Sequence, residues 1–139
     1  MTTEEVISII GLIGFGGILK SGFDFLISNK KSKNDAKQSF KEIRYKAIIL
    51  LCYSLVFHEK EKHNLLKNRP ELNSIENLRN EIYTEFINMS LFASDKVIIK
   101  MKEFIKDSNL QNLSHLAIAM RKDLYGTSTK ISGNLFEIN

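Results

Sequence analysis

The pattern of apolar and polar residues starts with a long apolar stretch near the beginning of the chain. Residues 6–19 contain no charged side chain, and apolar residues resume after Lys20 and continue to Ile27. A single helix over residues 6–27 would be about 33 Å long, which matches the roughly 30 Å hydrocarbon core of a bilayer. The pattern therefore predicts one membrane-spanning helix within an anchor over residues 1–29.

A secretory signal peptide and a buried core helix are the other interpretations of this stretch. A signal peptide needs basic residues before its apolar run, whereas here Glu4 and Glu5 precede the run and lysines follow it. A core helix stays an alternative, because Lys20 and Asp24 interrupt the apolar residues. Five of the seven glycines lie in the stretch, and small residues allow close helix contacts in lipid. An uncleaved anchor is therefore the favoured interpretation.

Beyond the anchor, apolar residues recur at spacings of three and four, which is the pattern of amphipathic helices. The first such stretch covers residues 34–66, and its apolar positions are Phe40, Ile43, Ala47, Leu50 or Leu51, and Leu55. The next helix is expected to have Ser74 as its cap, because the serine side-chain oxygen can accept a backbone N–H bond. The two helices after it are expected to begin at Ser94 with Asp95 and at Asn109. The helix after Ser74 is expected to run to about Phe92, and the last helix to end at Tyr125 before Gly126.

No run of period-two alternation is present, so no sheet is expected. The predicted fold class is all-α, with an N-terminal transmembrane helix followed by a cytoplasmic helical bundle of about four helices. The predicted parts of the chain are an anchor over residues 1–29, a basic linker over residues 30–39, a helical bundle over residues 40–126, and a polar, loosely held tail over residues 127–139.

Basic residues after the apolar stretch set its predicted orientation. Residues 28–46 contain seven Lys and Arg against two acidic residues, although the whole chain has a net charge of only +4. Basic flanks stay on the cytoplasmic side, so a single pass with the N-terminus outside is expected. Lys30, Lys31 and Lys33 are expected to contact anionic lipid headgroups. A nucleic-acid patch is the rival interpretation, but no aromatic residue precedes Phe40 in this stripe, and direct nucleic-acid binding is not expected.

A helical projection of the anchor separates a bulky face from a face of small and charged residues. The residues of the second face are Gly14, Gly17, Lys20, Ser21 and Asp24. Several copies packed around a shared interior would favour this segregation, because small residues permit close packing and intramembrane charges face protein or water. A homo-oligomer with these residues facing its interface or pore is therefore predicted. The alternative is that Lys20 extends to the headgroups and pairs with Asp24.

The residues that commonly carry catalysis or bind metals form no recognisable motif in this chain of 139 residues. Its single cysteine, Cys52, excludes an internal disulfide framework and is expected to be a core residue. His58 and His63 lie five positions apart, whereas the zinc-protease helix needs a spacing of four. No catalytic, cofactor-binding or metal-binding residue is therefore predicted.

Three segments, together with the acidic N-terminus, the Gly-rich span and the basic linker, carry a resemblance to a known family. They are residues 40–51 (FKEIRYKAIILL), residues 90–95 (SLFASD) and residues 119–126 (AMRKDLYG). The chain resembles small membrane-anchored accessory proteins of type VI-B CRISPR systems, which are encoded beside the RNA-guided RNase Cas13b. The resemblance implies a bacterial inner-membrane pore that depolarises the membrane and enhances antiphage defence once the RNase has found viral RNA.

The same resemblance implies a divergent HEPN-like domain, whose RNases use an Arg followed after four to six residues by a His. No Arg in this chain is followed by His at that spacing, and His115 and Arg121 occur in the reverse order. The resemblance therefore favours a non-enzymatic role. Two alternatives stay open: a membrane-tethered RNase that uses Arg121 and His115, and a passive adaptor that recruits a cytoplasmic partner to lipid.

Overall fold

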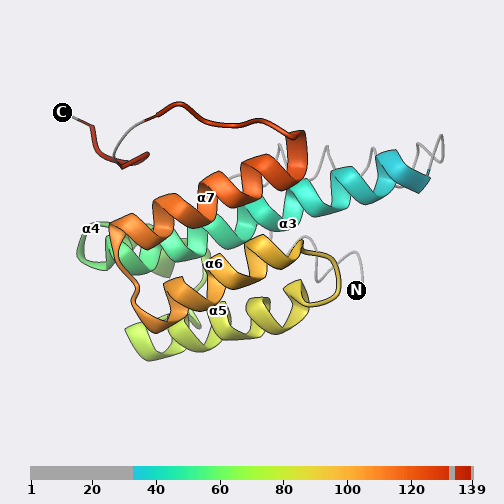
Figure 1. Cartoon of the computed structure of the whole chain (residues 1–139). Helices are drawn as coiled ribbons and strands as arrows, with labels where there is room; N and C mark the ends of the chain where they lie inside the picture. Colours follow the sequence, from blue (N-terminus) through green and yellow to red (C-terminus); the bar gives the residue numbers. More distant parts are fainter. Residues whose placement is uncertain (1–32, 132–133, 139) are drawn as a thin grey trace.

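A computed structural model describes residues 33–131 and 134–138, and all regular structure within these ranges is helical (Figure 1). The helices are α3 (Lys33–Val56), α4 (His58–Asn68), α5 (Ile75–Met89), α6 (Asp95–Lys106) and α7 (Leu110–Tyr125). The all-helical prediction is confirmed for this part of the chain. None of these helices combines the length and the apolarity that a membrane crossing requires. The predicted span, within residues 1–29, lies outside the described residues.

The residues predicted to mark helix boundaries lie at the ends of three of these helices. The side chains of Ser74, Ser94 and Asn109 each accept a hydrogen bond from the backbone N–H three residues later. Gly126 has a left-handed backbone with φ of 65°, and its N–H donates to the carbonyl of Lys122 at 2.8 Å. The predicted boundaries are confirmed, except that α5 ends at Met89 rather than near Phe92.

The stretch predicted as one helix over residues 34–66 forms two helices, α3 and α4, and this prediction is wrong. The helix is interrupted at Phe57, whose carbonyl accepts hydrogen bonds from the N–H groups of both Lys60 and Glu61 at 3.0 Å. The break redirects the polar helix α4 so that Leu65, its only buried residue, reaches the core. The bundle therefore contains five helices in its described part.

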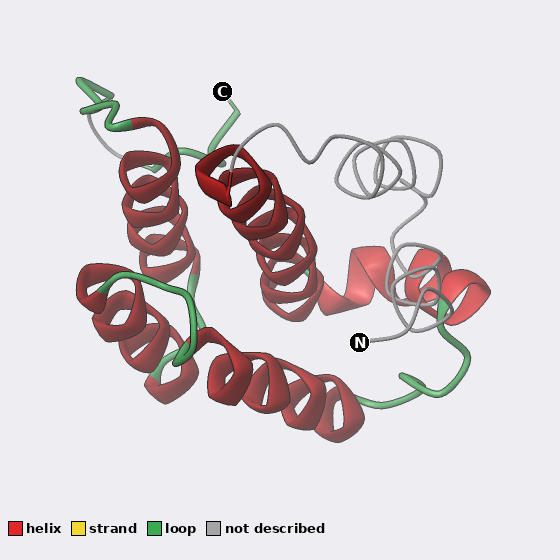
Figure 2. Ribbon diagram, turned by 90° about the vertical axis from the view of Figure 1, so that its right-hand side faces the viewer, coloured by secondary structure: helices red, strands yellow, loops and turns green. Residues whose placement is uncertain are grey.

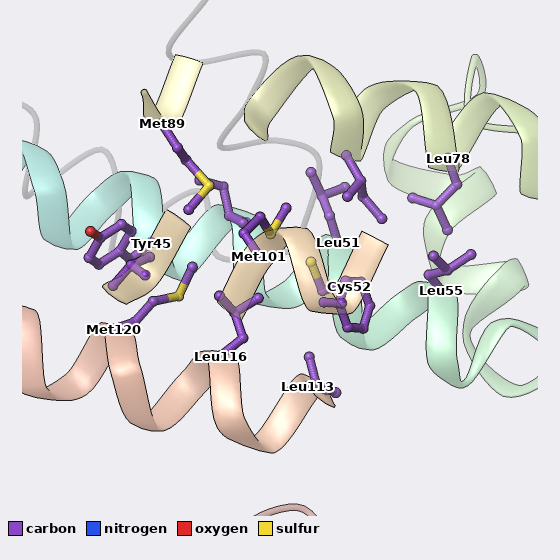
Figure 3. Close-up of a cluster of buried hydrophobic side chains, with 14 of the residues drawn as sticks. Tyr45, Leu51, Cys52, Leu55, Leu78, Met89, Met101, Leu113, Leu116 and Met120 are labelled. Carbon is purple, nitrogen blue, oxygen red and sulfur yellow. The ribbon is translucent and has the colours of Figure 1, made fainter. Parts of the chain in front are cut away.

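Helix α3 is central, since it packs against α4, α5 and α7, while α6 packs against α5 and α7 (Figures 1 and 2). The interior contains side chains from every helix, and Figure 3 shows its central part around Cys52, Met101 and Leu116. Of the apolar positions named for residues 34–66, the structure buries Ala47, Leu51 and Leu55. In the later helices it buries Leu78, Ile82, Met89, Val97, Met101, Phe104, Leu113, Leu116 and Met120. Phe40, assigned to the same apolar pattern, is 41% exposed.

The C-terminal tail contacts the bundle and differs from the loosely held segment that the sequence predicts. After Gly126 the tail turns back along α7 (Figure 1). The N–H of Leu135 donates to Ser114 Oγ at 2.9 Å, and the Phe136 ring lies 6.0 Å from the Tyr53 ring. Residues 134–138 therefore add an apolar contact over α3 and α7, which polar composition alone did not indicate.

Candidate functional site at the amino-terminal end of the bundle

The three segments that carry the family resemblance meet at one end of the bundle. The part of α3 from Lys37 to Tyr45, the turn between α5 and α6, and the last turns of α7 lie together there (Figure 1). This is also the end at which the described chain begins, at Lys33. We define the candidate site as the polar cluster and the hollow that these three segments form.

The polar cluster is centred on the carboxylate of Asp123, near the end of α7. Its Oδ2 accepts hydrogen bonds from the Tyr45 hydroxyl at 2.6 Å and from the Lys41 ammonium at 3.0 Å. The backbone of Ser94, in the turn between α5 and α6, also hydrogen-bonds this carboxylate. One side chain thus connects all three segments.

The cluster shifts the pKa values of Asp123 and Tyr45 in opposite directions. Burial alone would raise the pKa of Asp123, but the hydrogen bonds from Tyr45 and Lys41 outweigh it and hold the pKa below its usual value of 3.8. Burial, together with the adjacent carboxylate, raises the pKa of Tyr45 well above its usual value. Asp123 therefore stays ionised and Tyr45 stays a hydrogen-bond donor at neutral pH.

Two further contacts hold α3 against α7. The Gln38 amide donates to the carbonyl of Leu124, and Glu42 pairs with Tyr125 by a side-chain hydrogen bond. A charge pair links α3 to α5, where the Arg44 guanidinium contacts the Glu85 carboxylate and both side chains are at least nine-tenths buried. Burial raises the pKa of Glu85 more than the adjacent arginine lowers it. The first half of α3 is thus held from two sides.

Beside the polar cluster lies a hollow of about 530 Å³. It is lined by two lysines, an amide and three apolar side chains: Lys37, Lys41, Gln38, Phe40, Leu91 and Phe92. The Phe92 ring packs edge-on against Phe40 at 5.6 Å and lies 5.8 Å from Tyr45. Leu91 extends from the turn and is 87% exposed. The hollow therefore combines basic groups with an accessible apolar surface.

A second exposed feature is a row of apolar side chains on the outer face of α5. Tyr83 and Ile87 lie four residues apart, which turns them about 40° around the helix, and Ile75, eight residues before Tyr83, is turned about 80° from it. Their side chains are 43%, 54% and 55% exposed. We call these three residues the α5 row.

Most residues predicted to act in the membrane lie outside the described part of the chain. These residues are Gly14, Gly17, Lys20, Ser21, Asp24, Lys30 and Lys31. Lys33 is the first residue of α3. Their predicted roles at a pore, an oligomer interface or the lipid headgroups therefore stay predictions.

The residues named for other chemistry take no part in the polar cluster or in the lining of the hollow. His115 and Arg121 are both exposed on α7, and a separation of six residues turns them about 120° apart around the helix. Cys52 is fully buried, as predicted, and burial raises the pKa of its thiol, which leaves the thiol unreactive. His58 is half-buried and His63 is exposed, and the described residues hold no cluster of three metal-ligating side chains.

Sequence reasoning missed the polar cluster, because its members are far apart in the chain. Asp123 lies 78 positions from Tyr45 and 82 positions from Lys41. Tyr45 did leave a signal, since counting back from Cys52 in steps of four and three reaches Ile48 and then Tyr45 on the same face. No comparable signal identified Asp123 as its partner.

Comparison with known proteins adds no family to this description. The chain matches no family model, no curated protein and no solved structure.

Proposed function

We propose that this chain is a single-pass protein of the bacterial inner membrane whose copies assemble into a homo-oligomeric pore. Its N-terminus would lie outside and the helical bundle in the cytoplasm, with Gly14, Gly17, Lys20, Ser21 and Asp24 facing the interior of the assembly. By its resemblance, the pore would depolarise the membrane and enhance antiphage defence together with a Cas13b RNase. The role requires no cofactor and no catalytic residue.

The α5 row is the observation that supports the proposed association of several copies. Tyr83 and Ile87 are 54% and 55% exposed and lie about 100° or more around α5 from its buried residues Leu78, Ile82 and Met89, and Ile75 at the start of the helix is 43% exposed. Exposed apolar side chains that lie one turn apart, as Tyr83 and Ile87 do, can mark an interaction site. A second copy of the chain would cover the row and remove it from water.

The attachment of α3 supports a mechanical link between anchor and bundle. Helix α3 begins at Lys33, six residues after the apolar stretch ends at Ile27. Its first half is held by the Asp123 cluster and by the Arg44–Glu85 pair. Because these contacts join α3 to α7 and α5, a movement of the bundle would be transmitted to the start of α3.

Assembly is tested by placing a charge on the α5 row. The full chain in detergent is expected to form multimers, and Ile87→Glu should weaken their association by about 30-fold, the loss typical of a central interface residue. Mass photometry over a concentration series measures the change. Leu66→Glu is the matched control, because Leu66 is exposed on α4, away from the row, and should leave the multimers intact. A monodisperse monomer of the unaltered chain would refute the proposal.

A further inference from the structure

The hollow beside the Asp123 cluster has a preformed basic and apolar lining. Lys41 is held by its ion pair with Asp123, and the Gln38 amide is held by the carbonyl of Leu124. The Phe92 ring is fixed between Phe40 and Tyr45. Lys37 is exposed and forms no ion pair within residues 33–131 and 134–138. A ligand would therefore meet one uncompensated ammonium group on an ordered surface.

The apolar part of the lining projects into solvent. Leu91 is 87% exposed in the turn after α5, and Phe40 is 41% exposed on α3. These two side chains border the same hollow as the ammonium groups of Lys37 and Lys41. A surface with Lys side chains beside exposed Leu and Phe is suited to the boundary between lipid headgroups and acyl chains.

The position of the hollow in the sequence favours a membrane lipid as its occupant. Lys37 follows Ile27, the last residue of the predicted span, by ten residues, which cover at most about 36 Å when extended and about 15 Å as a helix. Lys30, Lys31 and Lys33 lie between them in the sequence and make this part of the sequence basic. The hollow thus stands at the end of the bundle that would face the cytoplasmic surface of the membrane, whose lipids are partly anionic.

We propose that this hollow binds the headgroup of an anionic phospholipid at the membrane surface. Lys37 and Lys41 contact the phosphate, and Leu91 and Phe40 enter the interfacial layer beside it. This inference rests on the membrane anchoring in the proposed function and adds to it a second lipid contact, made by the folded bundle. The contact fixes the end of α3 and the Asp123 cluster against the bilayer.

The test places an environment-sensitive fluorophore beside Leu91. Cys52 is fully buried, so a cysteine introduced by Ser90→Cys, at an exposed position of the same turn, can be labelled selectively. The labelled full chain is reconstituted into phosphatidylcholine vesicles with and without phosphatidylglycerol. The emission maximum of the fluorophore is expected to shift to shorter wavelength only in the anionic vesicles. A lipid-bound quencher should likewise reduce the emission only there.

Two variants and one control define the lipid contact. Lys37→Gln should lower the equilibrium constant for docking of the bundle on anionic vesicles by about fivefold, as expected for one lysine near an anionic surface. Leu91→Ala should lower the lipid quenching as well. Lys67→Gln, at an exposed position on α4 at the other end of the molecule, should change neither signal.

Flotation of the same vesicles separates this inference from the proposal on which it rests. If the chain fails to float with either vesicle type, the anchor and the lipid contact are both refuted. If the chain floats but the fluorophore stays in water in anionic vesicles, only the lipid contact is refuted. A blue shift in lipid-free detergent that depends on protein concentration would assign the hollow to a second copy of the chain, and would overturn the inference.

Discussion

Asp123 accepts hydrogen bonds from two side chains of α3, Tyr45 and Lys41, and this is the contact that joins the ends of α3 and α7. Its carboxylate is mostly buried, with a side chain that is 14% exposed. An ionised acceptor strengthens both hydrogen bonds. A buried donor left without its acceptor would make folding less favourable. At the residue scale, the charge of Asp123 therefore contributes to stability.

Replacing this carboxylate tests its contribution. Asp123→Asn should lower the free energy of unfolding by about 1–3 kcal/mol at pH 7, because both bonds lose their charged acceptor. The pKa of Asp123 is lowered on folding, so its contribution is present above the usual value of 3.8 and disappears as pH falls through the lower folded value. The difference between variant and unaltered chain should therefore shrink in strongly acidic solution.

Urea unfolding of the full chain in detergent, followed by circular dichroism at several pH values, measures this difference. Glu103→Gln is the control, because the Lys100–Glu103 pair is exposed on α6 and contributes little. Equal losses for the two variants at pH 7 would contradict the role of Asp123.

At the scale of elements, local signals determine where most helices begin and end. The left-handed Gly126 ends α7 directly after the turn that holds Asp123. A Cβ atom at this position would meet no atom within 4 Å, so a substitution there costs backbone strain and no steric clash. The conformation of Gly126 therefore supports the candidate site by fixing the last turn of α7.

Substitution of Gly126 separates backbone strain from side-chain contact. Gly126→Ala should destabilise the chain by about 1–2 kcal/mol, because an L-residue with a side chain resists the left-handed conformation. Gly126→Asn should cost less, since asparagine adopts this conformation more readily. Thermal unfolding of both variants measures the order, and an alanine variant at least as stable as the asparagine variant would contradict it.

At the scale of the whole molecule, the proposed pore depends on the small-residue face of the anchor. Gly17→Leu adds a bulky side chain to that face, where neighbouring helices would be close together. The variant should lose the membrane depolarisation that a voltage-sensitive dye reports in bacterial cells expressing the chain. Gly22→Leu is the matched control, because a helical projection of the sequence puts Gly22 about 20° from the bulky face. Equal depolarisation by the Gly17 variant and the unaltered chain would refute the pore.

The sequence by itself determined the helical class and the boundaries that depend on adjacent residues. Ser74, Asn109 and Gly126 cap helices through bonds within a few positions, so their effect can be read from the chain. The buried faces of α5, α6 and α7 were predictable for the same reason, because their periodicity is local.

Only the tertiary structure decided the break at Phe57 and the composition of the candidate site. The break brings Leu65 into the core, and this gain depends on neighbouring helices rather than on the residues beside Phe57. Tyr45 and Asp123 meet across 78 positions, and periodicity carries no information about pairs so far apart. Phe40 continues the apolar pattern of α3 but is 41% exposed and borders the hollow, where the Phe92 ring packs against it. Burial and pairing depend on which elements pack together, and the packing of distant elements determines the site.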